Sequence, residues 1–235
     1  MFSDDFSSGS IRWKAFEVDQ WGDLKELGVS VGVVPDPINS TDTQGKLRGN
    51  VAKFEVTGSP VWRDLEKTFF RMGYPTWNGD KVIPLVAAPS AVMCDIFIPA
   101  GTNTTYGLLS VHRLNPSTGE TRSVAGFEVS SIGILRGLAR DGKGKDTRKD
   151  SVRLPIGRWF KLGMEFRSDG KVIYLLDNKP LFDLDYTLSV PIGDYPAGFM
   201  DAHAGIIKSN KDTNDGMPEG FTVYNDNFKV VRYQK

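Results

Sequence analysis

The chain has 235 residues, of which 29 are basic and 29 are acidic, so its formal net charge at pH 7 is zero. A chain without net charge produces no overall field that attracts nucleic acid or an anionic membrane, so we expect neither partner, and any recognition of charge must be local. No apolar run reaches the length of about eighteen residues that a membrane-spanning helix needs, and the single cysteine, Cys94, excludes an internal disulfide.

The N-terminal segment MFSDDFSSGS has no basic region followed by an apolar core, so we expect no signal peptide in this chain. Three alternatives stay open: the protein remains where it is made, a signal has been removed before Met1, or the protein leaves the cell by another route, as in a virion. We expect an extracellular, cell-surface or virion-associated protein, with a cytoplasmic location as the alternative.

Strand signals dominate the chain, and helix signals are nearly absent. The 25 glycines and 13 prolines break the chain at short intervals, which is typical of an all-β sandwich or barrel. Residues 61–72 are ambiguous, because apolar residues recur there at helical spacing, and we favour a strand. Residues 139–151 carry charges of both signs and almost no apolar side chain, so we expect a mobile, solvated loop. The other predicted strands are residues 28–34, 50–57, 91–98, 105–114, 201–208 and 221–233.

The stretch from Arg158 to Phe182 is typical of two strands joined by a tight turn at Asp169-Gly170. This dipeptide suits the two positive φ angles of a two-residue type I′ turn, which would place Glu165 opposite Tyr174. Side chains alternate between the two faces of a strand. One face is therefore expected to be apolar, with Phe160, Leu162, Met164, Phe166, Ile173 and Leu175. The other is expected to be polar and to line an accessible hollow, with Lys161, Glu165, Arg167 and Tyr174.

The chain opens with SDDF at residues 3–6 and closes with YNDNF at residues 224–228. Its penultimate hairpin has the pattern W-x-K-L-x-x-x-x-x-S-D-G-x-V-x-x-x-x-D-N, from Trp159 to Asn178. These motifs resemble the concanavalin A-like lectin and glucanase superfamily, which includes laminin-G-like domains, carbohydrate-binding modules and jelly-roll polysaccharide lyases. The resemblance implies a single-domain, all-β jelly-roll sandwich of two antiparallel sheets over residues 1–235, and it specifies a fold more than a chemistry.

Two classes of polysaccharide-cleaving enzyme on this fold differ in the residues they need. A retaining glycosidase needs two carboxylates about 5 Å apart, and the chain has no strand with such a pattern, so glycoside hydrolysis is not expected. A polysaccharide lyase neutralises a uronate, abstracts a proton and protonates the leaving oxygen. The alginate-lyase strand patterns are not met, and the alternative is that both histidines of the chain are half-buried residues satisfied by the backbone. The candidate machinery for a lyase is His112, His203, Tyr174 and Lys161.

Sugar binding without chemistry needs only a flat aromatic surface and polar groups for the sugar hydroxyls. We expect two tryptophans to wall such a groove, although each of them would equally plug an end of the sandwich. The candidate carbohydrate-binding residues are His112, Arg113, Lys161, Glu165, Tyr174 and His203, with Trp62 and Trp77 as the walls.

Three aspartates near the two ends of the chain, Asp4, Asp5 and Asp226, are candidate ligands for a structural Ca²⁺ ion, which prefers oxygen ligands. The resemblance is in line with this, because laminin-G-like relatives hold calcium at this kind of position. The alternative is that Asp5 and Asp226 cap turns and bond backbone amides. No cluster of histidine and cysteine predicts zinc, and no organic cofactor is expected.

These observations lead to three hypotheses. The first is a non-enzymatic, lectin-like module that binds a polysaccharide or a surface glycan on the concave face of a sheet. The second is a polysaccharide lyase that cleaves a uronate-containing polymer by β-elimination. The third is a structural or decoration protein whose partners are other subunits of a surface or virion assembly.

Overall fold

The computed structural model describes the strands and their connecting turns in thirteen ranges of the chain. Within these ranges every regular element is a β-strand, and no helix that could span a membrane is found. The described residues are 2–10, 15–16, 29–42, 45–56, 69–72, 77–78, 81–82, 88–101, 107–114, 121–130, 132–187, 200–209 and 221–233.

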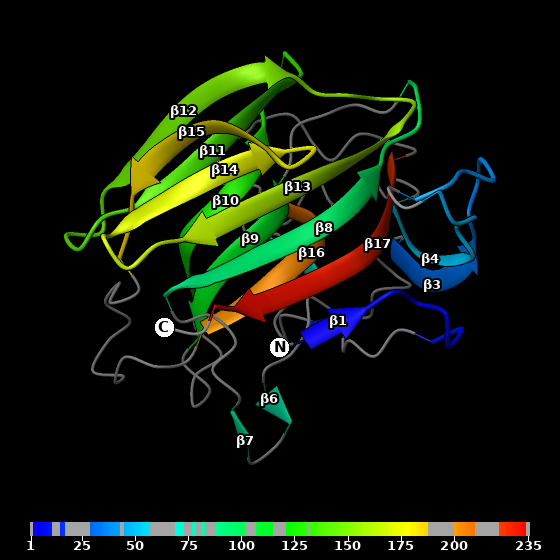
Figure 1. The fold of residues 1–235 in the computed structure, drawn as a ribbon, viewed down its shortest axis with the longest axis horizontal. Coiled ribbons are helices and arrows are strands. Elements are labelled where there is room, and N and C mark those ends of the chain that lie inside the picture. The colour runs from blue at the N-terminus through cyan, green and yellow to red at the C-terminus, as the bar shows by residue number, and fades with distance from the viewer. Residues whose placement is uncertain are drawn as a thin grey trace, which may run out of the picture.

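Two antiparallel sheets face each other and form a jelly-roll β-sandwich, as the sequence predicted (Figure 1). The eight-stranded sheet contains, in spatial order, β15 (Lys179–Asp185), β14 (Lys171–Leu176), β13 (Trp159–Phe166), β8 (Ser90–Phe97), β17 (Phe221–Arg232), β4 (Asn50–Val56) and β3 (Val29–Pro35), with β1 (Phe2–Asp4) paired to β17. The seven-stranded sheet contains β12 (Asp146–Arg153), β11 (Ile134–Arg140), β10 (Thr121–Val129), β9 (Gly107–Leu114), β16 (Met200–Ser209), β5 (Phe69–Met72) and β2 (Ala15–Phe16). A separate pair joins β6 (Trp77–Asn78) to β7 (Lys81–Val82).

Most of the predicted strands are present and differ from the observed ones only at their ends. The structure confirms the strands expected near 28–34, 50–57, 91–98, 105–114, 201–208 and 221–233 as β3, β4, β8, β9, β16 and β17. Of the ambiguous segment 61–72, residues 69–72 form β5, and the remainder lies outside the described residues.

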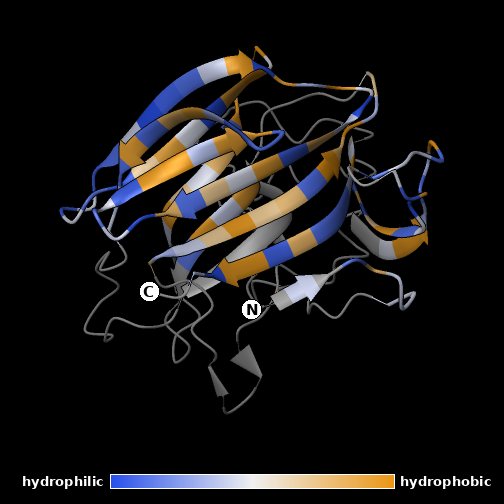
Figure 2. Ribbon diagram, in the orientation of Figure 1, coloured by the Kyte–Doolittle hydropathy of each residue, from blue (hydrophilic) through white to orange (hydrophobic). Residues whose placement is uncertain are grey.

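The hydrophobic core fills the space between the two sheets. Along several strands apolar and polar residues follow one another, which appears as a change between orange and blue in Figure 2. In β8, for example, Val92, Cys94 and Ile96 are fully buried in the core, and Asp95 lies on the opposite, outer face of the same strand. Because side chains alternate, the outward positions of the central strands are the ones that can contact a ligand.

The central hairpin is confirmed, but its predicted register is wrong by one residue. Phe166 pairs with Val172 and Met164 pairs with Tyr174, whereas the sequence predicted that Glu165 pairs with Tyr174. The turn has three residues, because the N–H of Gly170 bonds the carbonyl of Arg167 at 3.2 Å and the glycine adopts a φ of 81°. This is the hairpin type in which a type I turn is closed by a residue in the left-handed region. A shift of one residue moves every side chain of β14 to the other face.

The charged segment 139–151 is also different from its prediction as a mobile loop. A turn at residues 141–145 leads into β12, an edge strand that pairs with β11. Its charges are matched across the two strands, with Arg136 bonding Asp150 and Arg140 bonding Asp146, both at 2.5 Å. Charged side chains are common on edge strands, where they also discourage pairing with other chains.

Candidate functional site

Tyr174, predicted to bind sugar or to take part in a lyase reaction, lies in the core. It is 0% exposed, and its ring stacks on Phe182 with the ring centroids 4.9 Å apart. Its hydroxyl donates a hydrogen bond to the backbone carbonyl of Leu138 in the facing sheet. Burial raises the pKa of Tyr174 far above its ordinary value, so the phenol is neutral. The prediction for Tyr174 is therefore wrong, and the cause is the one-residue error in register.

Lys161 and Glu165 lie on the outer face of the eight-stranded sheet, as the alternation along β13 predicted, because Leu162, Met164 and Phe166 between and beside them are buried in the core. The ammonium nitrogen of Lys161 lies 3.8 Å from an oxygen of Asp95. The carboxylate of Glu165 instead accepts a hydrogen bond of 3.2 Å from the hydroxyl of Tyr233. The predicted polar face thus exists, but its aromatic member is a different tyrosine.

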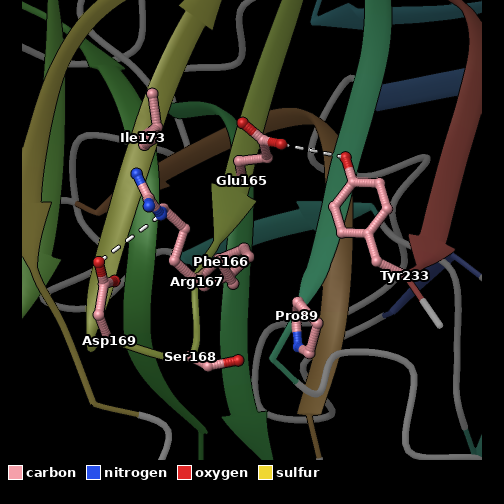
Figure 3. Close-up of a pocket in the computed structure, with 8 residues that line it drawn as sticks. All are labelled: Pro89, Glu165, Phe166, Arg167, Ser168, Asp169, Ile173 and Tyr233. Atoms are coloured by element: carbon pink, nitrogen blue, oxygen red, sulfur yellow. Dashed lines mark hydrogen bonds and ion pairs between the residues drawn. The ribbon is translucent and has the colours of Figure 1, made fainter. Parts of the chain in front are cut away.

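A hollow of about 570 Å³ opens on this outer face, beside the turn of the central hairpin (Figure 3). Its volume is in the range of about 300–1,000 Å³ that is common for small-molecule sites. We call it the hairpin hollow; it is lined by Pro89, Glu165, Phe166, Arg167, Ser168, Asp169, Ile173 and Tyr233.

The hairpin turn supplies the charged groups of the hairpin hollow. The three-residue turn directs Arg167 and Asp169 to the same side, where the guanidinium and the carboxylate lie 3.6 Å apart (Figure 3). Both side chains are more than half exposed, so this ion pair is screened by water and leaves both groups free to exchange partners. Ile173, from β14, contributes an apolar side chain to the lining.

Tyr233 forms the opposite side of the hairpin hollow, just after the end of β17 (Figure 3). Its backbone N–H bonds the carbonyl of Pro89 at 3.0 Å, which fixes the residue beside β8, and its side chain is 44% exposed overall. Partial burial and then the charge of Glu165 raise the pKa of Tyr233, so the phenol keeps its proton and its hydroxyl donates a hydrogen bond to Glu165. The sequence analysis missed this residue, although its aromatic side chain follows directly on the alternating final strand.

His112 lies on the other sheet, in the central strand β9, and is 6% exposed. Its Nε2 atom is 2.8 Å from the hydroxyl oxygen of Ser110, two residues earlier on the same strand. In the register of the seven-stranded sheet, Asp201 lies opposite His112, and His203 lies opposite Ser110. The backbone therefore places both histidines of the chain at neighbouring positions, as the lyase hypothesis requires, but on a different sheet from Lys161.

The other predicted site residues are described only in part. Trp62 lies outside the described residues. Only the backbones of Arg113 and Trp77 are described: Arg113 pairs with Arg122 and with Met200, and Trp77 pairs with Val82. The predictions for these side chains, as for His203, remain predictions.

Asp226 is part of a buried group of charges on the outer face of the eight-stranded sheet. The guanidinium of Arg48 bonds Asp226 and, at 2.9 Å, Asp95, and it lies over the ring of Trp159 at 4.3 Å from the centroid. The indole N–H of Trp159 in turn donates to Asp36 at 3.2 Å. We call these five residues the Arg48 cluster. Burial raises the pKa of Asp226 to about 6, against the lowering effect of the charge of Arg48.

Two of the three aspartates of the predicted calcium site, Asp5 and Asp226, bond different partners. Asp226 is engaged by Arg48 and by the side-chain amide of Asn227. Asp5 accepts bonds from the backbone N–H and the hydroxyl of Ser7, which is the turn-capping role considered as the alternative, and only the backbone of Asp4 is described. No group of three or more potential metal ligands is found among the described residues. The calcium site remains a prediction.

The fold of this chain also occurs in proteins of known structure whose sequences differ widely from it. No family model and no curated protein matches the chain. The chain is 12% identical to an endo-β-1,4-glucuronan lyase from the fungus Trichoderma reesei, with 93% of this chain and 94% of that one covered and a TM-score of 0.58. It is 13% identical to a cellulose induced protein, over 100% and 99% of the two chains, with a TM-score of 0.59. An alginate lyase is 12% identical over 82% of each chain, with a TM-score of 0.51. At these identities the comparisons show that the chain has the fold of these proteins.

Proposed function

We propose that the protein is a carbohydrate-binding domain and that the hairpin hollow holds a sugar unit of its glycan. The observation that carries the proposal is the arrangement of Tyr233, Glu165 and Arg167 around one accessible hollow. The fold shared with polysaccharide lyases and a cellulose induced protein supports a carbohydrate as the ligand.

The chemistry of the hairpin hollow suits a pyranose ring. A sugar presents an apolar C–H face to a flat aromatic ring and hydroxyls at its edge, and Tyr233 and Ile173 offer apolar surface for the face. The carboxylate of Glu165 accepts hydrogen bonds from hydroxyls, and the guanidinium of Arg167 donates them. The ion pair of Arg167 with Asp169 is exposed and weak, so replacing it by a hydrogen bond from Arg167 to a ligand hydroxyl costs little free energy.

Binding of the protein to a glycan array, followed by titration of the best glycan, tests the proposal. We expect Tyr233→Ala to weaken binding at least about tenfold. The variant loses the contact of the aromatic ring with the sugar and the hydrogen bond of the hydroxyl, and together these contribute about 1.4 kcal/mol or more to the free energy of binding. Glu165→Gln should weaken binding as well. Glu128→Gln is the matched control, because this partly exposed carboxylate lies on the seven-stranded sheet and should leave binding unchanged.

Two outcomes would count against carbohydrate binding in the hairpin hollow. Equal binding by the wild type and by Tyr233→Ala would place the glycan elsewhere on the molecule. Silence of the wild type over a broad panel of neutral, amino and acidic glycans would leave the structural, decorating role as the explanation of the fold.

A second candidate function, cleavage of a uronate polymer by β-elimination, is favoured by the pair of His112 and Ser110. The imidazole is bonded to a hydroxyl near the centre of the seven-stranded sheet, and the backbone places His203 opposite Ser110. Such a group can exchange a proton with a bound substrate. Incubation with alginate, glucuronan and glycosaminoglycans should then produce an unsaturated sugar that absorbs in the ultraviolet, and His112→Ala should abolish it. A flat trace with every uronate polymer rejects this function.

A further inference from the structure

The outer face beside the hairpin hollow carries a row of three side chains from neighbouring strands. Ile173 of β14 pairs with Glu165 of β13 on one side and with Asp183 of β15 on the other. Residues directly opposite each other in antiparallel strands lie on the same face. Strands are about 4.8 Å apart, so the apolar side chain is flanked by two acidic residues whose backbone positions are about 10 Å apart.

Around these two carboxylates, negative charges outnumber positive charges within the described part of the chain, although Lys171 also attracts Asp183 electrostatically. Each of the two cations nearby has an aspartate closer to it than Glu165 or Asp183: Arg167 lies 3.6 Å from Asp169 in an exposed, exchangeable pair, and Lys171 lies 2.6 Å from Asp185. Neither Glu165 nor Asp183 forms an ion pair with another described residue, and the one polar partner of Glu165 is the neutral hydroxyl of Tyr233. The region therefore has two surplus negative charges.

We propose, building on the proposed function, that the hairpin hollow selects a sugar that carries a protonated amine and rejects a uronate. An ammonium group beside Glu165 would form a charge-assisted hydrogen bond, and the exposed ring of Tyr233 offers a π surface to the same cation. The apolar face of the sugar would rest on Ile173. A uronate carboxylate in the same place would face Glu165, with Asp183 on the next strand but one, and like charges oppose binding.

If the hairpin hollow rejects uronates, it is not the binding site for a uronate polymer cleaved at the other sheet. The ligand class it implies is a glycan that contains hexosamine residues with free amino groups. N-acetylation of the amine removes the positive charge and keeps the sugar ring, so an acetylated oligomer is a close chemical control for the proposed contact.

Titration calorimetry of the full chain with oligomers of matched length, made of glucosamine, N-acetylglucosamine or glucuronic acid, tests this selection. We expect the glucosamine oligomer to bind about tenfold more tightly than the acetylated one, the difference that a charge-assisted hydrogen bond provides, and to weaken with added salt. Glu165→Gln should remove the preference, and Glu128→Gln should keep it, because Glu128 lies on the other sheet.

The outcomes separate this inference from the proposed function. If both hexosamine oligomers bind with equal affinity and Tyr233→Ala weakens both, the selection for an amine is wrong and sugar binding in the hairpin hollow stands. Tighter binding of the glucuronic acid oligomer at the same residues also overturns the selection. If no sugar of any class binds, the proposed function itself fails, and the inference fails with it.

Discussion

The outer face of the eight-stranded sheet carries two groups of charged residues that differ in burial and in charge balance. In the Arg48 cluster the side chain of Arg48 is 3% exposed, and the two carboxylates that it pairs with, those of Asp95 and Asp226, are buried with it. In the hairpin hollow the charges are exposed, and Glu165 has no cationic partner among the described residues. Burial of a charge is costly unless it is paired, whereas an exposed charge is solvated by water and can wait for a ligand.

This difference indicates that the Arg48 cluster stabilises the fold and that the hairpin hollow is available to bind a ligand. The Arg48 cluster joins the 36–49 segment to β8, β13 and β17, because Arg48 contacts residues of all three strands. Its guanidinium is buried between these partners, so it is not accessible to a ligand at the surface. In the hairpin hollow the link to another strand is the exposed hydrogen bond from Tyr233 to Glu165, so its polar groups can be altered with little effect on the fold.

The largest expected effect is the loss of stability on removal of Arg48. Arg48→Ala leaves Asp95 and Asp226 buried without their shared cation, which should lower the free energy of unfolding by about 3–5 kcal/mol. Arg167→Ala, in the exposed pair of the hairpin hollow, is the matched control and should leave the free energy of unfolding nearly unchanged. Urea unfolding of both variants measures the contrast, and equal losses would mean that the two groups do not differ as described.

A smaller effect is expected from pH, through Asp226. Its pKa of about 6 in the folded protein is above the ordinary value of 3.8, so the folded state takes up a proton before the unfolded state does. This contribution to stability is complete below the ordinary pKa and is lost as the pH rises through about 6. Between about pH 7 and about pH 5 the free energy of unfolding should therefore rise by about 1 kcal/mol.

Thermal unfolding of the wild type and of Asp226→Asn over this pH range measures the effect of Asp226. The variant should lose most of the dependence. Other carboxylates act in a different range: hydrogen bonds from Ser40 and its neighbours hold the pKa of Asp36 low in spite of its burial, so its contribution is lost only below the ordinary value of 3.8. A wild-type protein that becomes less stable between neutral pH and about pH 5 would contradict the account of Asp226.

A similar loss, about 1 kcal/mol, is expected from Trp159→Phe, which removes the hydrogen bond of 3.2 Å from the indole to Asp36 and keeps an aromatic ring beneath Arg48. Urea unfolding again provides the measurement. A loss as large as that of Arg48→Ala would show that the indole of Trp159, and not the ion pairs, holds the Arg48 cluster together.

The smallest effect on stability is expected in the hairpin hollow. Tyr233→Phe removes only an exposed hydrogen bond to Glu165, so the melting temperature should stay within error of the wild-type value. Glycan affinity should fall in the same variant, because the hydroxyl positions Glu165. A variant that loses stability but keeps its affinity would reverse the roles assigned to the two groups.

Much of the fold could be predicted from local alternation, and the errors come from interactions that alternation does not contain. Asp169-Gly170 fits a two-residue turn and also a three-residue turn with Gly170 in the left-handed region, and the sequence does not decide between them. This single residue moved Tyr174 from the expected surface into the core. In the same way, the charges of 139–151 indicated a solvated loop, because the pairs of Asp150 with Arg136 and of Asp146 with Arg140 form only when β12 folds back on β11.

The candidate site was predicted in part for the same physical reasons. Lys161 and Glu165 reach the outer face because alternation along β13 is a local property. Arg48 gave no signal, since its partners lie 47 and 178 residues away along the chain. Tyr233 reaches Glu165 only because β17 runs beside β8, which no pattern within either segment reveals.

The most direct test of the central claim is to map where a glycan contacts the protein, by NMR chemical-shift changes of backbone amides during titration with the best glycan from the array. The account predicts that the largest changes occur at Glu165, Arg167, Ile173 and Tyr233, around the hairpin hollow. Changes centred instead on Ser110 and His112 of the seven-stranded sheet, with the hairpin hollow unaffected, would contradict it.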